Sequence, residues 1–99
     1  MEIIKVPGDD NLTLKIIGSI DSQAAPQFEA ELTPMFDNSK NIILDFAEVA
    51  YISSAGMRVL LTGQKLAKAK NGKLSITGVT SFVMEIFDVT GFSKILDFI

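Results

Sequence analysis

Apolar and polar positions alternate at the start of the chain. Residues 3–6 are typical of a short β-strand, and a turn cluster of Pro, Gly, Asp and Asn follows at residues 7–11. In the next segment Leu12, Leu14 and Ile16 alternate with polar residues, which is the period of a half-buried strand. Together these segments predict a β-hairpin at the edge of a sheet.

A helical period replaces this alternation further along the chain. Its apolar positions follow the spacing i, i+4, i+7 and i+8, which places them on one face of an amphipathic helix: Phe28, Leu32, Met35 and Phe36. Asp21 and Ser22 supply an N-cap, and Pro26 belongs in the first turn. Pro34 is expected to kink or end the helix, because proline removes a backbone hydrogen bond.

Residues 41–46 are an almost uninterrupted apolar run, which is typical of a central strand covered on both faces. A second helix is predicted from the Ser53-Ser54 pair to about Lys70, ending at Asn71-Gly72. One side of this helix carries its apolar stripe: Val59, Leu60, Gly63, Leu66 and Ala67. Small residues on that side would let the helix lie close against the sheet: Gly56, Gly63 and Ala67.

The last third of the chain predicts a strand at residues 74–77 and a third helix. Ser81 is expected to cap this helix, with Val83, Ile86 and Phe87 facing inward and Thr90-Gly91 at its end. Residues 95–99 fit either a last short strand or a docking tail. The order β-β-α-β-α-β-α(-β) predicts one α/β domain over residues 1–99, with a mixed sheet of four to five strands and about three helices.

Composition narrows the chemistry. The chain has 99 residues, of which 47% are hydrophobic and 21% charged, as in an ordinary globular domain. No apolar run approaches the ~20 residues that a membrane span needs, and the start has no signal-peptide layout, so a cytoplasmic protein is expected. Cysteine and histidine are both absent. Because they supply thiolates, the usual neutral-pH base and common metal ligands, we expect no enzyme activity, no metal and no cofactor.

Positive charge is unevenly placed along a chain whose net charge is −3. No acidic residue occurs between Val49 and Met84, a stretch that holds five cations: Arg58, Lys65, Lys68, Lys70 and Lys73. The net negative charge argues against a broad nucleic-acid surface. The cations fit either a solvated helix face or a local basic patch for an acidic partner or a phosphate.

Two serines stand at the mouth of the second helix. A serine there can cap exposed backbone N–H groups. A phosphate on the same hydroxyl would meet those N–H groups and the positive end of the helix dipole. Arg58 is a nearby cation, and Gly56 is expected to leave the backbone beside the hydroxyl uncovered for another protein's approach. The residues alone leave a plain helix cap and a phosphorylation site both open.

A longer pattern around these serines resembles the signature of the STAS domain, the module named for sulphate transporters and anti-sigma factor antagonists. The matching stretch is 45–61, with an apolar strand closed by Asp45-Phe46 and the run from Tyr51 to Met57. Residues 18–21 are similar to the family's glycine-x-aliphatic-aspartate strand end, and 87–92 to its threonine-glycine-aliphatic helix end. The element order matches the family along essentially the whole chain.

The resemblance implies a partner-switching regulator. In anti-sigma factor antagonists of this family, the serine matching Ser54 is phosphorylated by an anti-sigma factor with serine-kinase activity. The unmodified antagonist binds that kinase and frees a sigma factor, phosphorylation breaks the complex, and a serine phosphatase restores it. Many family members carry an aspartate where this chain has Ser53, which leaves Ser53 as a second site or as a helix cap.

The expected partner surface surrounds Ser54 and consists of Asp21, Ser53, Gly56, Met57, Arg58 and Leu61. Met57 and Leu61 form an apolar i, i+4 pair that fits either boundary packing or partner contact, and Asp21 fits either a turn or the same surface. The alternative function is a STAS adaptor or scaffold subunit in a stress-signalling or lipid-transport complex, since one fold supports both uses. A monomer or weak dimer without nucleic-acid or membrane binding is expected for the antagonist, and a large assembly for the adaptor.

Overall fold

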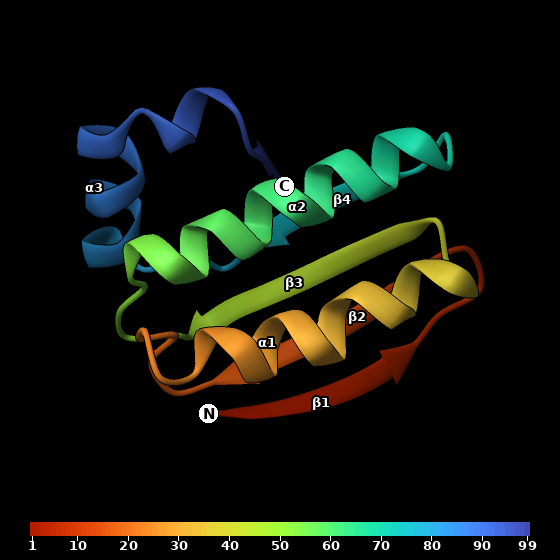
Figure 1. Ribbon diagram of the computed structural model, residues 1–99, viewed down its shortest axis with the longest axis horizontal. Coiled ribbons are helices and arrows are strands. Elements are labelled where there is room, and N and C mark those ends of the chain that lie inside the picture. Colours follow the sequence, from red (N-terminus) through yellow and green to blue (C-terminus); the bar gives the residue numbers. More distant parts are fainter.

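A computed structural model describes all residues, 1–99, and its strands form one five-stranded sheet in the order β1-β2-β3-β4-β5 (Figure 1). The edge hairpin pairs antiparallel and the other neighbours pair parallel. The strand bounds are β1 Glu2–Pro7, β2 Leu12–Ile17, β3 Asn41–Glu48, β4 Lys73–Thr77 and β5 Asp97–Phe98. The mixed sheet and the predicted order of elements are therefore confirmed, and the C-terminal segment is a strand.

Three α-helices connect the parallel strands: α1 Ala25–Leu32, α2 Ser54–Ala69 and α3 Ser81–Thr90. Two short 3-10 helices, η1 Thr33–Asp37 and η2 Phe92–Lys94, follow α1 and α3. Helices α1 and α2 lie side by side on one face of the sheet, and α3 stands at the end where α2 begins (Figure 1). No helix is both long enough and apolar enough to cross a membrane.

The core lies between this helix layer and one face of the sheet. Along β3 the burial alternates, with Ile42, Leu44 and Phe46 buried while Ile43 and Asp45 are half-buried. The prediction that this strand is covered on both faces is therefore wrong. Helices α1 and α2, which lead into and out of β3, pack on the same face of the sheet. The opposite face of β3 mixes apolar and polar residues; Ile43, for example, lies between Thr13 of β2 and Ser75 of β4.

Helix α2 comes close to the sheet and to α1 where it has no side chain. A Cβ on Gly63 would lie 2.7 Å from Leu74 Cδ2 and 3.3 Å from Leu32 Cδ2. A Cβ on Gly56 would lie 2.8 Å from side-chain atoms of Ile20 and Ile52. The distances of 2.7 and 2.8 Å are too short for a real Cβ, so the predicted role of small residues on this side of α2 is confirmed for Gly56 and Gly63.

The ends of the helices agree with the sequence signals, but two predicted N-caps do not. The predicted cap of α1 at Asp21-Ser22 is displaced, because Ala24 is the N-cap residue and makes no side-chain capping hydrogen bond. Helix α1 ends at Leu32 and continues as the 3-10 helix that holds Pro34, so the predicted stop is confirmed. The predicted cap of α3 is wrong by one residue: Thr80 is the N-cap, its hydroxyl accepts a hydrogen bond from Val83 N at 3.2 Å, and Ser81 is the first helical residue. Gly91 ends α3 with φ 81°, as its position predicts.

Candidate functional site

The residues around Ser54 are brought together by a parallel bridge between two loop segments, at Ile20 and Ile52. Ile20 N donates to Tyr51 O at 2.8 Å, and Ser53 N donates to Ile20 O at 2.8 Å. This bridge extends the pairing of β2 with β3 beyond the strand ends. Asp21, the next residue after Ile20, is therefore held beside the start of α2.

The two serines at the start of α2 have different environments. Ser53 has extended backbone angles (φ −87°, ψ 170°), is 6% exposed, and accepts a hydrogen bond from Gly56 N on its Oγ at 3.1 Å. Ser54 is the first helical residue and is exposed to solvent. Ser53 is thus the helix cap, and Ser54 presents its hydroxyl to the outside.

The loop before α1 is ordered by Asp21. Its Oδ1 accepts a hydrogen bond from Ala24 N at 2.8 Å, and its backbone oxygen accepts one from Ala25 N at 3.0 Å. Asp21 itself is exposed. Asp21 therefore caps the turn that leads into α1, three residues before the N-cap residue Ala24, and its carboxylate remains at the surface near Ser53.

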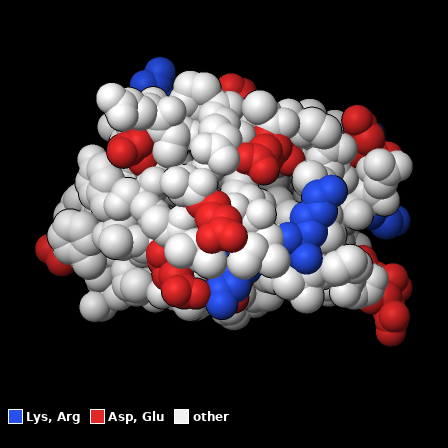
Figure 2. Space-filling view, turned by 90° about the horizontal axis from the view of Figure 1, so that it is seen from below, with Lys and Arg blue, Asp and Glu red and all other residues white.

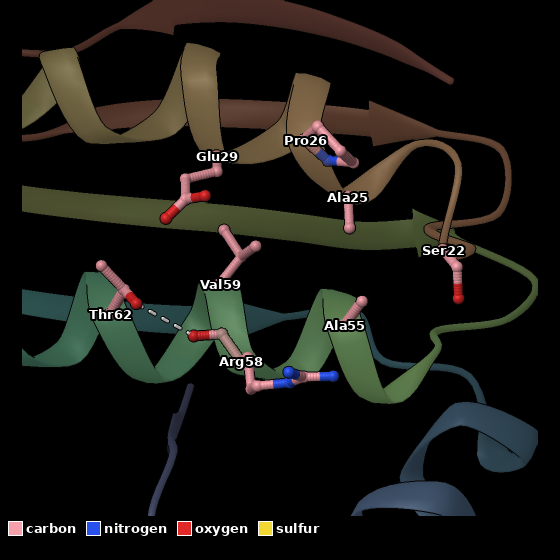
Figure 3. Close-up of a pocket in the computed structure, with 8 residues that line it drawn as sticks. All are labelled: Ser22, Ala25, Pro26, Glu29, Ala55, Arg58, Val59 and Thr62. Atoms are coloured by element: carbon pink, nitrogen blue, oxygen red, sulfur yellow. Dashed lines mark hydrogen bonds between the residues drawn. The ribbon is translucent and has the colours of Figure 1, made fainter.

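A cleft of about 420 Å³ lies between α1 and α2 and begins at Ala55, the residue after Ser54 (Figure 3). It is lined by Ser22, Ala25, Pro26, Glu29, Ala55, Arg58, Val59 and Thr62. Arg58 and Glu29 face the cleft from opposite helices, and the Arg58 guanidinium extends along α2 toward its first turn (Figure 3). Sequence reasoning missed Ser22 and Glu29 as site residues, because only the packing of α1 against α2 brings them there.

The structure divides the residues that were expected to form the partner surface. Asp21 and Arg58 are exposed and Leu61 is half-buried. Met57 is only 4% exposed, because its sulphur lies under α3, 3.7 Å from Thr90 Oγ1. Of the apolar pair, Met57 therefore packs inside the protein, and only Leu61 remains partly accessible to a partner.

Gly56 does not uncover the backbone beside Ser54, and that expectation is wrong. The residue is buried, and its Cα faces Ile20 and Ile52 in the core. An exposed aromatic residue that the sequence argument did not select is Tyr51, which is 43% exposed in the loop just before the two serines. Its place inside an apolar stretch gave no signal that the side chain points outward.

The cations between Val49 and Met84 are all exposed: Arg58, Lys65, Lys68, Lys70 and Lys73. Lys70 Nζ lies 3.9 Å from Asp37 Oδ1, at the end of α2 far from Ser54. Figure 2 shows the face that carries the edge strand, where positive and negative side chains are interspersed with uncharged surface. The exposure of Lys65, Lys68 and Lys70 agrees with a solvated helix face, and Arg58 is the cation that lines the cleft.

Comparisons with known proteins agree with this geometry. The family model described as "Mlab, STAS domain" matches residues 6–97. The Bordetella bronchiseptica protein BtrV, named among the anti-sigma factor antagonists, is 35% identical over 88% of this chain and 76% of its own. A Thermotoga maritima structure named in the same class superposes with a TM-score of 0.89 at 17% identity, over 97% of this chain and 84% of the other.

The fold also matches the structure of a protein in a phosphorylated form. The Bacillus cell fate determinant SpoIIAA in its phosphorylated form has a TM-score of 0.75 at 15% identity, over 99% of this chain and 91% of the other. At this identity the likeness shows the fold alone. Family membership follows from the family model, which matches nearly the whole chain: the chain belongs to the STAS domain family.

Proposed function

We propose that this protein is an anti-sigma factor antagonist whose binding state is switched by phosphorylation of Ser54. The observation that carries the proposal is the difference between the two serines: Ser53 is buried as the cap of α2, and Ser54 is exposed beside it. The names of BtrV and of the Thermotoga relative support the function class. In this proposal the unmodified chain binds an anti-sigma factor that is a serine kinase, and thereby frees a sigma factor.

The proposed modification is a transfer of the γ-phosphoryl group of ATP inside the complex. A bond forms between Ser54 Oγ and the γ-phosphorus, and the bond from that phosphorus to the β–γ bridging oxygen breaks. The hydroxyl proton goes to a base of the kinase, and ADP leaves. This chain contributes the hydroxyl and its position, because the cap on Ser53 fixes the first turn of α2.

The phosphate would dissociate the complex by its charge. It brings about −1.5 to −2 charges to a hydroxyl that had none, and it adds three strong acceptor oxygens. Asp21 already places a carboxylate at this end of the fold. An interface that closed over these groups would have to desolvate like charges, which is unfavourable. A serine phosphatase would restore the binding form by hydrolysis.

The exposed groups around Ser54 define the proposed contact surface: Asp21, Tyr51, Ser54, Arg58 and the exposed part of Leu61. Ser53, Gly56 and Met57 lie behind this surface and support it from the core. Substitution of Tyr51 or Arg58 is expected to weaken kinase binding without loss of fold, whereas Ser54→Ala is expected to stay bound and to resist phosphorylation. Substitution of the second group is expected to act mainly through stability.

The test combines the purified chain with its cognate anti-sigma factor kinase and Mg-ATP, followed by intact-mass and fragment mass spectrometry. We expect one phosphate, on Ser54, and none on the Ser54→Ala variant. Ser81 is a matched control, since it is also an exposed first residue of a helix that follows a capping hydroxyl. Stoichiometric phosphate on Ser81 or Ser53, with Ser54 unmodified, would refute the assignment.

A second arm tests the switch itself. With ADP present, we expect the unmodified chain to form a complex with the kinase in size-exclusion chromatography, and the Ser54→Asp variant to elute separately. Equal binding of both forms would contradict the proposed switch.

The alternative function is a STAS adaptor or scaffold subunit. The description of the family model supports this alternative, because it names Mlab and no sigma factor. An adaptor would bind its partner with Ser54 unmodified, and Ser54→Ala would change nothing. Light scattering separates the two functions: a monomer or weak dimer supports the antagonist, and a large homo-assembly supports the scaffold.

A further inference from the structure

We propose that Arg58 is the intramolecular counter-ion of the phosphate on Ser54, and that it stabilises the phosphorylated form. The inference rests on the proposed function, since that function supplies the phosphate. It assigns to this one side chain a role in the regulation of the switch. Arg58 would act on the modified state and would have no catalytic part in the transfer.

The first support is the spacing of the two residues on α2. Ser54 and Arg58 are separated by four positions, and side chains at i and i+4 of a helix are neighbours, with Cβ atoms about 6 Å apart. Helical side chains lean toward the N-terminus, and the Arg58 guanidinium does extend toward the first turn of α2 (Figure 3). A phosphate on Ser54 therefore lies within reach of the guanidinium without movement of the backbone.

The second support is that Arg58 has no partner in the unmodified chain. Two salt bridges are present, Lys15 with Glu48 and Lys70 with Asp37, and neither includes Arg58. The guanidinium is exposed at the mouth of the cleft, opposite Glu29. An arginine fork that is already charged and unpaired can pair with phosphate oxygens in a bidentate way, without first breaking another ion pair.

The third support is the charge that surrounds the phosphate. From the α1 side, Asp21 lies beside the start of α2 and Glu29 lines the cleft, so these two acids would oppose a phosphate. Arg58 is the single cation that lines the cleft. It therefore offsets part of a repulsion that would otherwise destabilise the phosphorylated protein.

The chain contains an internal comparison that separates Arg58 from a general effect of a helix N-terminus. Ser81 occupies the same position on α3 that Ser54 occupies on α2: it is exposed, it is the first helical residue, and a capping side chain precedes it. The residue four positions after Ser81 is Glu85, which is exposed and acidic. The helix dipole would favour a phosphate at both places, but only the Ser54 position has a cation at i+4.

The pair would change what a partner meets at this surface. In the unmodified chain the free guanidinium is available at the mouth of the cleft for an acidic group of the kinase. After phosphorylation the phosphate pairs with the guanidinium, so a free cation is replaced by an ion pair whose own net charge is about −0.5 to −1. Phosphorylation therefore removes an attractive group and adds a repulsive one in a single step.

The experiment installs phosphoserine at position 54 during translation, so that no kinase is needed, and follows the phosphate by ³¹P NMR as a function of pH. An exposed ion pair of ordinary strength lowers the pKa of the phosphate, so we expect its acid dissociation constant to be about threefold larger in the wild-type background than in Arg58→Gln. Lys65→Gln is the matched control, because Lys65 is also an exposed cation on α2 but lies about 16 Å from Ser54 along the helix axis. It should match the wild type.

A third protein carries phosphoserine at position 81, and its phosphate should titrate at higher pH than the one at position 54. A second readout needs no variant: the Arg58 Nε–H resonance should move downfield when position 54 carries phosphoserine in place of serine. Equal titration of wild type and Arg58→Gln, an equal effect of Lys65→Gln, or equal titration at positions 54 and 81 would each overturn the proposal. A kinase that ignores Ser54 would refute the proposed function and would leave these measurements unchanged.

Discussion

Replacement of Ser53 by alanine removes the hydroxyl that accepts a hydrogen bond from Gly56 N at 3.1 Å. Both groups are buried, so water does not replace the lost partner. Loss of an N-cap costs about 0.5–2 kcal/mol, and a buried N–H without an acceptor puts this case in the upper half of that range. We therefore expect Ser53→Ala to reduce the free energy of unfolding by about 1–2 kcal/mol.

Ser54→Ala is the matched variant, because it removes the same hydroxyl from the adjacent residue. Ser54 is exposed and makes no hydrogen bond through its side chain, so its loss should stay within about 0.5 kcal/mol. Urea unfolding followed by circular dichroism measures both values. Thermal unfolding gives a second estimate, since 1 kcal/mol shifts the Tm of a domain of this size by roughly 4–8 °C.

In a phosphorylation assay the variant with the larger effect is the other one: Ser53→Ala has the larger effect on stability, and Ser54→Ala has the larger effect on phosphorylation. Ser53→Ala should still accept phosphate on Ser54, and Ser54→Ala should accept none. If Ser54→Ala destabilised the fold as much as Ser53→Ala, the assignment of cap and free hydroxyl would fail. If Ser53→Ala abolished phosphorylation while the protein remained folded, Ser53 would have a direct role that its buried cap does not explain.

Three further predictions concern the scaffold. Gly72→Ala should lower the free energy of unfolding in urea by more than about 2 kcal/mol, because the new Cβ would clash with the backbone oxygen of Lys40. Gly91→Ala is its control: the new Cβ meets no neighbour within 4 Å, so the loss should be about 1 kcal/mol and come from the φ of 81° alone. Phe87→Ala should cost about 3–5 kcal/mol, because the fully buried ring lies between Phe46 and Phe98, with centroids 6.4 and 5.8 Å away. The hydrogen bond to Glu48, and then the charge of Glu48, raise the pKa of Lys15 above its ordinary value of 10.5 in the folded protein. The ion pair therefore adds to the free energy of unfolding below pH 10.5, and this contribution is lost as pH rises through the higher pKa of the folded state. As pH rises past 10.5, the urea midpoint should therefore fall more in the wild type than in Glu48→Gln, and an equal fall would contradict this linkage.

The sequence predicted most of the fold because its elements are set by local periodicity and by strong stop signals. The alternation at Leu12, Leu14 and Ile16 gave the second strand of the hairpin, and Pro34 gave the end of α1. These signals act within a few residues of themselves. The cap of α3 was misplaced by one residue because Thr80 and Ser81 both carry a hydroxyl, and only the backbone conformation decides which one caps.

The remaining errors concern contacts between distant segments. Met57 was expected at a surface border, and its burial depends on Thr90 of α3, which is 33 residues away in the chain. Gly56 was expected to expose backbone, and its burial depends on the bridge between Ile20 and Ile52. The run at residues 41–46 could not reveal an open sheet face, because that depends on which side both connecting helices take. Periodicity does not carry this information.

The difference between Ser53 and the aspartate that the family resemblance leads one to expect there has a structural explanation. Ser53 is the N-cap of α2, and serine and aspartate are about equally good N-caps, so the exchange preserves the start of the helix. It also removes a negative charge from the residue next to Ser54. A phosphate on Ser54 would then face Asp21 and Glu29 without a third acid, which leaves Arg58 as a more effective counter-ion. The substitution thus keeps the cap of the helix that presents Ser54 and makes that cap neutral.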